Sequence, residues 1–159
     1  MLIRTVRDSD LPALAAIAAE TMRPHVEASG GDPSLVTEDF LRSTLSESRV
    51  LVAEVAGDAA AFIQYQIRPP RLIVNGAAVS PALQRKGMGE RLFARAVLEA
   101  KDEGCGEVII SVQPSNVGIH DLYRRLGFRD GENPSGWNQE MSMSMEGVLG
   151  LLEERAARD

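Results

Sequence analysis

At the centre of this sequence stands Val79-Ser80-Pro81-Ala82-Leu83-Gln84-Arg85-Lys86-Gly87-Met88-Gly89, where a predicted strand passes through a glycine-containing turn directly into a predicted helix. Gly87 and Gly89 lack Cβ atoms, so a ligand can approach the backbone closely there. The first N–H groups of a helix have no partner inside it, and the helix dipole favours an anion at this end. The turn is therefore predicted to bind phosphate.

Basic residues gather around the same turn. Between residues 85 and 95 a single acid, Glu90, stands against four basic residues, which are Arg85, Lys86, Arg91 and Arg95. A Walker loop is excluded because Gly89 is followed by Glu90, and a dinucleotide fingerprint is excluded because its third glycine would fall at Leu92. The alternative to a phosphate site is that the glycines only join the strand to the helix.

Strand and helix patterns alternate on both sides of this turn, which predicts a fold that mixes the two. Upstream we expect a strand over Leu2 to Val6, a helix with a stripe from Leu11 to Ala18, an irregular stretch between Met22 and Pro33, a helix opened by Thr37, a hairpin of Val50 to Ala56 and Ala59 to Ile67 turning at Gly57-Asp58, and a strand over Leu72 to Val79. Downstream we expect a helix over Gly87 to Glu103, a strand over Glu107 to Gln113, a helix with a stripe from Ile119 to Leu126, a strand over Asn138 to Met145 and an amphipathic helix around Val148 to Leu152.

Composition narrows the class of protein. The 159 residues fit a single domain spanning 1–159, with no repeat or linker to divide it. A formal charge of −6 argues against a dedicated nucleic-acid partner. The sequence has no apolar run long enough for a bilayer and no signal-peptide pattern, which predicts a cytoplasmic protein. Its single cysteine, Cys105, excludes an intramolecular disulfide and cannot form a zinc site by itself.

Two ordered motifs resemble one family. Gln84-Arg85-Lys86-Gly87-Met88-Gly89 resembles a Gln/Arg-x-x-Gly-x-Gly/Ala signature, and Asn116 followed by Tyr123-Arg124-Arg125-Leu126-Gly127-Phe128 resembles an Asn then Tyr-x-x-Leu-Gly-Phe segment. Both are typical of the GNAT superfamily of N-acetyltransferases, as is the opening Ile3-Arg4 strand followed by Asp8, Asp10, Leu11 and Pro12. The resemblance extends from residue 3 to residue 128.

The resemblance implies a fold and a cofactor. The fold would be α/β (α+β), a GNAT-like mixed, mostly antiparallel central sheet flanked by helices. The cofactor would be acetyl-CoA, used as the acetyl donor, with no metal. The backbone around Val79 would pair with the pantetheine arm, and the N–H groups from Arg85 to Glu90 would cradle the pyrophosphate. The implied cofactor-binding residues are Val79, Gln84, Arg85, Lys86, Gly87, Met88, Gly89, Glu90 and Asn116.

The resemblance also implies a catalytic residue, Tyr123, which would act as a general acid beside the thioester sulfur. A phenol with an ordinary pKa of about 10 stays protonated at neutral pH, which suits that role. A neutral amine would attack the acetyl carbonyl directly, while N–H groups on the strand of Val79 stabilise the oxyanion. The alternative for Tyr123 is a core aromatic on the helix stripe beside Leu122.

The base that deprotonates the amine is left open. Many relatives place a glutamate on the strand corresponding to Leu72 to Val79, whereas this sequence has Asn75 and no acid there. The candidates are Glu54, Glu20, Glu27, His25 and an ordered water; His120 is expected to be exposed on its helix. An acidic segment from Glu27 to Glu47 suits a cationic acceptor, and Trp137 either lines the acceptor pocket or serves as a core or dimer contact.

The sequence is consistent with two alternative functions. The first is an acetyl-CoA-dependent N-acetyltransferase acting on a small-molecule or peptide amine. The second is a non-catalytic acyl-CoA-binding or sensing module of the same fold, which would explain Asn75. Neither function involves a nucleic acid or a membrane. A homodimer, to which Val148 to Leu152 would contribute, is a further expectation.

Overall fold

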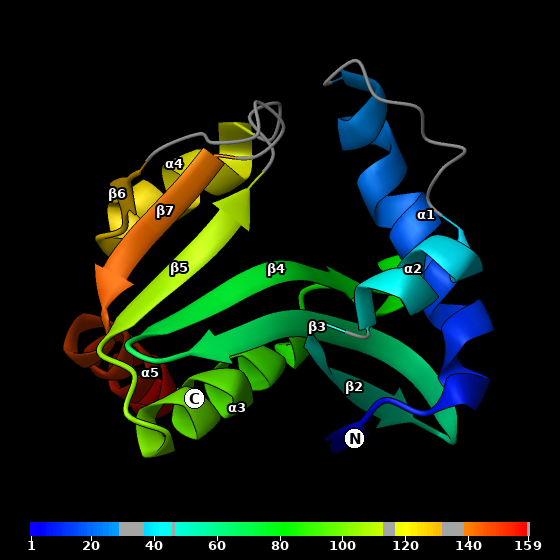
Figure 1. Ribbon diagram of the computed structural model, residues 1–159, viewed down its shortest axis with the longest axis horizontal. Helices are drawn as coiled ribbons and strands as arrows, with labels where there is room; N and C mark the ends of the chain where they lie inside the picture. Colours follow the sequence, from blue (N-terminus) through cyan, green and yellow to red (C-terminus); the bar gives the residue numbers. More distant parts are fainter. Residues whose placement is uncertain (29–36, 46, 113–116, 132–138, 159) are drawn as a thin grey trace. The chain divides into compact units, whose positions relative to one another are not determined.

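Short strands and helices alternate along the chain in the computed structural model, which describes residues 1–28, 37–45, 47–112, 117–131 and 139–158. The elements, with helices and strands labelled as in Figure 1, are β1 (Leu2–Thr5), the 3-10 helix η1 (Asp8–Asp10), α1 (Leu11–Ala28), α2 (Glu38–Leu45), β2 (Arg49–Val55), β3 (Asp58–Arg68), β4 (Arg71–Val79), the 3-10 helix η3 (Pro81–Leu83), α3 (Met88–Asp102), β5 (Glu107–Val112), α4 (Val117–Leu126), β6 (Arg129–Asp130), β7 (Gln139–Ser144) and α5 (Met145–Arg158).

The strands form a seven-stranded sheet in the order β1-β2-β3-β4-β5-β7-β6. The pairs β1/β2, β2/β3, β5/β7 and β6/β7 are antiparallel, whereas β4 and β5 run parallel where residues 71–74 face residues 107–110. Parallel neighbours need a crossover connection, which α3 provides. This mixed, mostly antiparallel sheet with helices confirms the predicted fold class.

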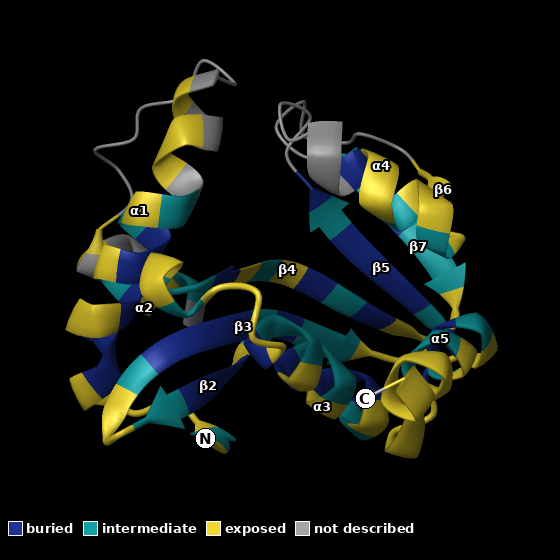
Figure 2. Cartoon of the chain, turned by 180° about the vertical axis from the view of Figure 1, so that it is seen from behind, coloured by how far each residue is buried: buried dark blue, intermediate teal, exposed yellow. Residues whose placement is uncertain are grey.

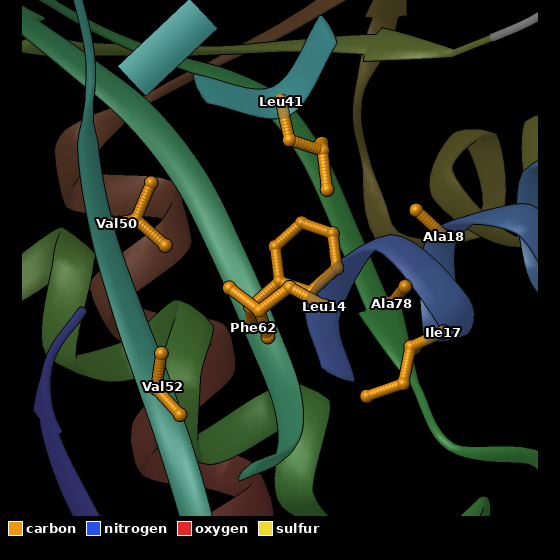
Figure 3. Close-up of a cluster of buried hydrophobic side chains, with 8 residues drawn as sticks. All are labelled: Leu14, Ile17, Ala18, Leu41, Val50, Val52, Phe62 and Ala78. Atoms are coloured by element: carbon orange, nitrogen blue, oxygen red, sulfur yellow. The ribbon is translucent and has the colours of Figure 1, made fainter. Parts of the chain in front are cut away.

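The chain divides into two compact units. The first comprises Met1–Gln66 and Asn75–Phe93, and the second comprises Ile67–Val74 and Ala94–Asp159. In the first unit, α1 and α2 pack on one face of the strands through a buried apolar cluster, drawn in Figure 3: Leu14, Ile17, Ala18, Leu41, Val50, Val52, Phe62 and Ala78. In the second, β5 is mostly buried (Figure 2), and Met141 of β7 and Val148 of α5 are almost completely inaccessible to solvent.

Helix α1 is longer than predicted. We expected the chain to become irregular after Met22, but the helix continues through Pro24 to Ala28. Proline has a helical φ and removes only one backbone donor, so a helix can pass it by losing the bond to the carbonyl of Glu20. Glu20 is exposed, and water can solvate that carbonyl.

The β2–β3 hairpin turns one residue earlier than predicted. Val55 pairs with Asp58, which leaves Ala56 and Gly57 as the two turn residues, with φ angles of 53° and 88°. A two-residue type I′ turn requires positive φ at both central positions, and its twist matches that of the strands. The prediction of a Gly57-Asp58 turn was therefore wrong by one position. The short strand β6 was not predicted, because two residues carry no alternating pattern.

Among the described residues, no helix has both the length and the apolar character needed to cross a membrane.

Candidate functional site

The connection between β4 and α3 belongs to the first unit and is fixed by hydrogen bonds at both ends. Ser80 donates its N–H to the carbonyl of Ala60 on β3 at 2.8 Å, and Leu83 donates to the carbonyl of Ser80 at 2.8 Å, which closes η3. At the other end, Arg91 donates to the carbonyl of Gly87 at 3.1 Å, the first bond of α3. Residues 84–90, which we call the phosphate loop after the predicted role, are thus held between two ordered elements.

Two residues of the phosphate loop have left-handed backbone. The φ of Arg85 is 66° and that of Gly87 is 81°. Gly87 accepts this conformation freely, but Arg85 does not, since a Cβ atom makes left-handed backbone unfavourable by about 1–2 kcal/mol. Such backbone turns point successive N–H groups to one side and form concave anion sites, and strain of this kind clusters at functional sites.

The side chains around the phosphate loop divide into anchors and exposed cations. Met88 and Leu92 are buried, 7% and 0% exposed, and fasten the start of α3 to the interior. Arg85, Lys86 and Arg91 are exposed. The geometry of an α-helix leaves the N–H groups of its first turn without carbonyl partners inside the helix, so positive charge and free donors occur together at this end.

Three of the predicted cofactor-binding residues, Met88, Gln84 and Gly89, differ in exposure and in their contacts. Because Met88 is buried, its contribution to a ligand is limited to its backbone. Gln84 is exposed and turns its side chain back, donating from Nε2 to the carbonyl of Val79 at 3.1 Å. Gly89 has ordinary φ, and an added Cβ would lie 3.7 Å from Cγ2 of Val79, an ordinary contact. Gln84 therefore closes the phosphate loop onto the end of β4.

The predicted catalytic residue, Tyr123, belongs to the second unit and lies at the end of α4. Gly127, with a φ of 107°, donates to the carbonyl of Arg124 at 3.1 Å, and Phe128 donates to the carbonyl of Tyr123 at 3.0 Å. These two bonds and the left-handed glycine make a Schellman cap. The cap explains the spacing of Tyr123, Gly127 and Phe128, since the residues at its two ends pack together.

The ring of Tyr123 packs edge-on against that of Phe128, with centroids 5.3 Å apart and planes inclined by 66°. Phe128 is buried, and Tyr123 is half-buried. Burial raises the pKa of the Tyr123 phenol above its ordinary value because the phenolate loses solvation. The hydroxyl group therefore remains a proton donor over the whole neutral range.

Glu54, one of the candidate bases, has a structural partner. Its Oε2 accepts a bond from Nε of Arg4 at 2.5 Å, and the same guanidinium binds Asp10 with Nη1 and Nη2 at 2.7 and 2.8 Å. Arg4 and Glu54 are 12% and 22% exposed. Glu54 is therefore already engaged in an ion-pair network with Arg4 inside the first unit, so it is a poor candidate for the base.

The other candidate bases and Asn75 differ in their exposure to solvent. Glu20 and Glu27 are exposed on α1, and Asn75 is exposed on β4. His120 is buried, 5% exposed, so the prediction of an exposed histidine was wrong: it occupies the inward side of α4. Asn116, Trp137 and the side chain of His25 lie outside the described residues.

Sequence reasoning missed two features. The left-handed Arg85 has no signal in composition or periodicity. The glycine directly after the helical stripe did predict the end of the helix at Gly127, but the packing of Tyr123 on Phe128 across that cap was not predicted.

Comparisons with known proteins agree with the fold and the motifs. The sequence model of the Acetyltransferase (GNAT) family matches residues 13–128. Streptothricin acetyltransferase of Streptomyces lavendulae is 33% identical over 94 residues, which are 57% of this chain and 50% of that protein. A Bacillus subtilis protein named Uncharacterized N-acetyltransferase YvbK is 33% identical over 76 residues, 46% of this chain and 49% of that protein. The chain spans about half the length of these relatives.

Among solved structures, the PaiA N-acetyltransferase of Thermoplasma acidophilum in complex with coenzyme A has a TM-score of 0.74 to this chain. The likeness covers 90% of this chain and 98% of that one, at 18% sequence identity. At this level of identity the likeness establishes the fold alone.

Proposed function

Because this chain belongs to the Acetyltransferase (GNAT) family, we propose that it is an acetyl-CoA-dependent N-acetyltransferase whose acceptor is a small-molecule or peptide amine. The observation that carries the proposal is the phosphate loop. It combines left-handed backbone at Arg85 and Gly87, exposed cations and the N-terminus of α3 in one short segment. These features fit the pyrophosphate of coenzyme A, because each of them favours an anion against the backbone.

The proposed roles follow the chemistry of the groups. N–H groups between Arg85 and Glu90 hold the pyrophosphate, and the backbone around Val79 and the side chain of Asn116 bind the rest of the cofactor. The amine nitrogen forms a bond to the acetyl carbon, the bond between that carbon and sulfur breaks, and the amine proton passes to a base or to water. Tyr123 donates a hydrogen bond, and then a proton, to the departing sulfur.

Cofactor binding is tested by calorimetry with acetyl-CoA on the wild type and on Gly89→Ala. The added methyl group has room within the protein and lies in a helix, where alanine is favoured over glycine by about 0.5–1 kcal/mol. We expect Gly89→Ala to unfold at higher urea concentration than the wild type and yet to bind acetyl-CoA more weakly. If its affinity equals that of the wild type, or if the wild type fails to bind at millimolar acetyl-CoA, the site is assigned wrongly.

Turnover is tested by release of CoA thiol with streptothricin, short peptides with a free N-terminus, and simple alkyl amines. For an accepted amine we expect Tyr123→Phe to lower kcat by about ten-fold to a hundred-fold, since general acids contribute at least this much. KM for acetyl-CoA should change little, because phenylalanine preserves the contact with Phe128. An unchanged kcat would remove Tyr123 from the mechanism.

The second candidate function is a non-catalytic acyl-CoA-binding module. It is favoured by one observation, that Glu54 is engaged by Arg4 while β4 carries Asn75 rather than an acid. Binding of acetyl-CoA without thiol release across the whole amine panel would support this function over the transferase.

A further inference from the structure

A concave groove in the first unit is lined by none of the phosphate loop residues, although it borders them at Leu83. It has a volume of about 370 Å³ and is lined by one side of α1, the end of the β2–β3 hairpin and the connection that follows β4. This volume falls in the range of small-molecule sites, which begins at about 300 Å³. The lining residues are Ala13, Ala16, Ile17, Glu20, Val55, Asp58, Ala59, Ala60, Ser80 and Leu83.

Small side chains create the hollow. Ala13 and Ala16 from α1 face Ala59 and Ala60 from β3, and none of these four extends beyond a methyl group. Ile17 belongs both to the groove and to the buried cluster of Figure 3, so the floor of the groove is the outer surface of the core. Such a floor favours an apolar ligand, since apolar contact with it removes hydrocarbon surface from water.

Two carboxylates give the groove its charge. Glu20 comes from α1 and Asp58 from the first position of β3, and both are exposed. Within the part of the chain that the structure describes, neither side chain forms an ion pair, and the lining residues include no lysine or arginine. The groove therefore combines an apolar floor with negative charge that no lining cation balances.

We propose that this groove binds an organic cation, a primary ammonium carried on a short apolar chain. The chain lies on the alanine floor, and the ammonium group pairs with Glu20 and Asp58. The inference concerns the first unit alone and requires neither acetyl-CoA nor turnover, so it stands or falls independently of the proposed acetyltransferase activity.

The test uses n-hexylammonium as the probe and hexanoate as its control, since the two share an alkyl chain and differ in the sign of charge. Two-dimensional NMR on the uniformly labelled protein, without acetyl-CoA, should show saturable shifts of the amides of Ala13, Ala16, Ala59 and Ala60 with hexylammonium. Hexanoate should not produce them. Equal shifts with hexanoate, or hexylammonium shifts elsewhere with none at these amides, would overturn the proposal.

Variants separate the charge from the shape of the groove. The double variant Glu20→Gln/Asp58→Asn preserves the shape of the groove. Its affinity for hexylammonium should be about ten-fold lower than that of the wild type, as expected for the loss of two exposed ion pairs. Ala16→Leu should block the groove and abolish the shifts. The control Glu146→Gln removes one exposed acid from α5 in the second unit and should change nothing. Retained affinity in the double variant would refute the assigned site, and calorimetry with acetyl-CoA on the same variants reports separately on the cofactor.

Discussion

At the scale of single residues, the strain at Arg85 is the feature of the phosphate loop that most favours function over simple connection. A loop that only joins β4 to α3 has no need for a left-handed arginine, because glycine at the same position would avoid the unfavourable contact of the Cβ atom. The exposed guanidinium, two positions before Gly87, places charge beside the first turn of α3. We interpret the strain as the consequence of keeping a cation there.

This interpretation predicts opposite effects of Arg85→Gly on stability and on binding. Relief of left-handed backbone, about 1–2 kcal/mol, exceeds the entropic disadvantage of glycine, about 0.5–1 kcal/mol, so the free energy of unfolding should rise slightly. Affinity for acetyl-CoA should fall, because one positive charge is lost. Urea unfolding and calorimetry measure the two quantities.

Lys86→Gly is the matched control, because it removes the same charge from a residue whose φ is not positive. Lys86→Gly should lower the affinity for acetyl-CoA by a similar factor. Unlike Arg85→Gly, it should lower the free energy of unfolding, by about 0.5–1 kcal/mol. If both variants destabilise the protein equally, the left-handed backbone at Arg85 is not strained and the interpretation fails.

At the scale of elements, the Tyr123 to Phe128 segment has a structural explanation as well as a proposed catalytic one. The glycine terminates α4, and the two aromatic rings close the cap, so this spacing is required even without chemistry. Only the hydroxyl group of Tyr123 is left unexplained by capping. Tyr123→Phe is therefore the informative substitution, and larger changes at this position would confuse loss of catalysis with loss of the cap.

Gly127→Ala should destabilise the protein through the cap. An alanine at a φ of 107° is strained, and its Cβ would lie 3.2 Å from Cε of Met143, closer than most real contacts. We expect the free energy of unfolding to fall by about 1–2 kcal/mol. Gly150→Ala on α5 meets nothing within 4 Å and should raise it by about 0.5–1 kcal/mol. If urea unfolding gives Gly127→Ala the same free energy of unfolding as the wild type, the left-handed cap at Gly127 is contradicted.

At the scale of the whole molecule, local patterns could be read from the sequence and distant partnerships could not. The helix of Met88, Leu92 and Ala96 was predicted because its apolar stripe repeats every turn, and the phosphate loop because its glycines directly precede that stripe. The base was not predictable. Whether Glu54 is free depends on Arg4, fifty residues away in the chain, and no periodicity encodes that contact.

The net charge of −6 likewise conceals distinct local environments. The phosphate loop exposes cations, whereas the groove beside α1 carries two acids. Both local charges arise because the fold brings particular side chains to one surface. The net charge of the whole sequence therefore predicts neither the cationic loop nor the acidic groove. The same dependence on distant contacts governs the stability of the protein toward acid.

Asp10 connects acid stability to the first unit as a whole. It is 6% exposed, accepts two bonds from Arg4 of β1, and accepts a third from the N–H of Arg7 at 2.7 Å. Hydrogen bonding to Arg4, against the opposing effect of burial, lowers the pKa of the Asp10 carboxyl below its ordinary 3.8. A lowered folded-state pKa stabilises the fold above the unfolded-state pKa, and this stabilisation disappears as the pH falls through the folded-state pKa.

Asp10→Asn should therefore lower the free energy of unfolding at neutral pH by about 2 kcal/mol, because Arg4 loses its charged partner while Glu54 remains. The deficit should begin to shrink as the pH falls below about 4, where the wild-type carboxyl in the unfolded chain takes up its proton. The two proteins should become alike once the pH has also fallen through the lower folded-state pKa of Asp10. Urea unfolding of both proteins across the acid range measures this convergence, with Glu153→Gln, an exposed acid on α5, as the control. Parallel curves for wild type and Asp10→Asn would show that the charge of Asp10 does not stabilise the fold, and that Arg4 holds β1, β2 and η1 together without it.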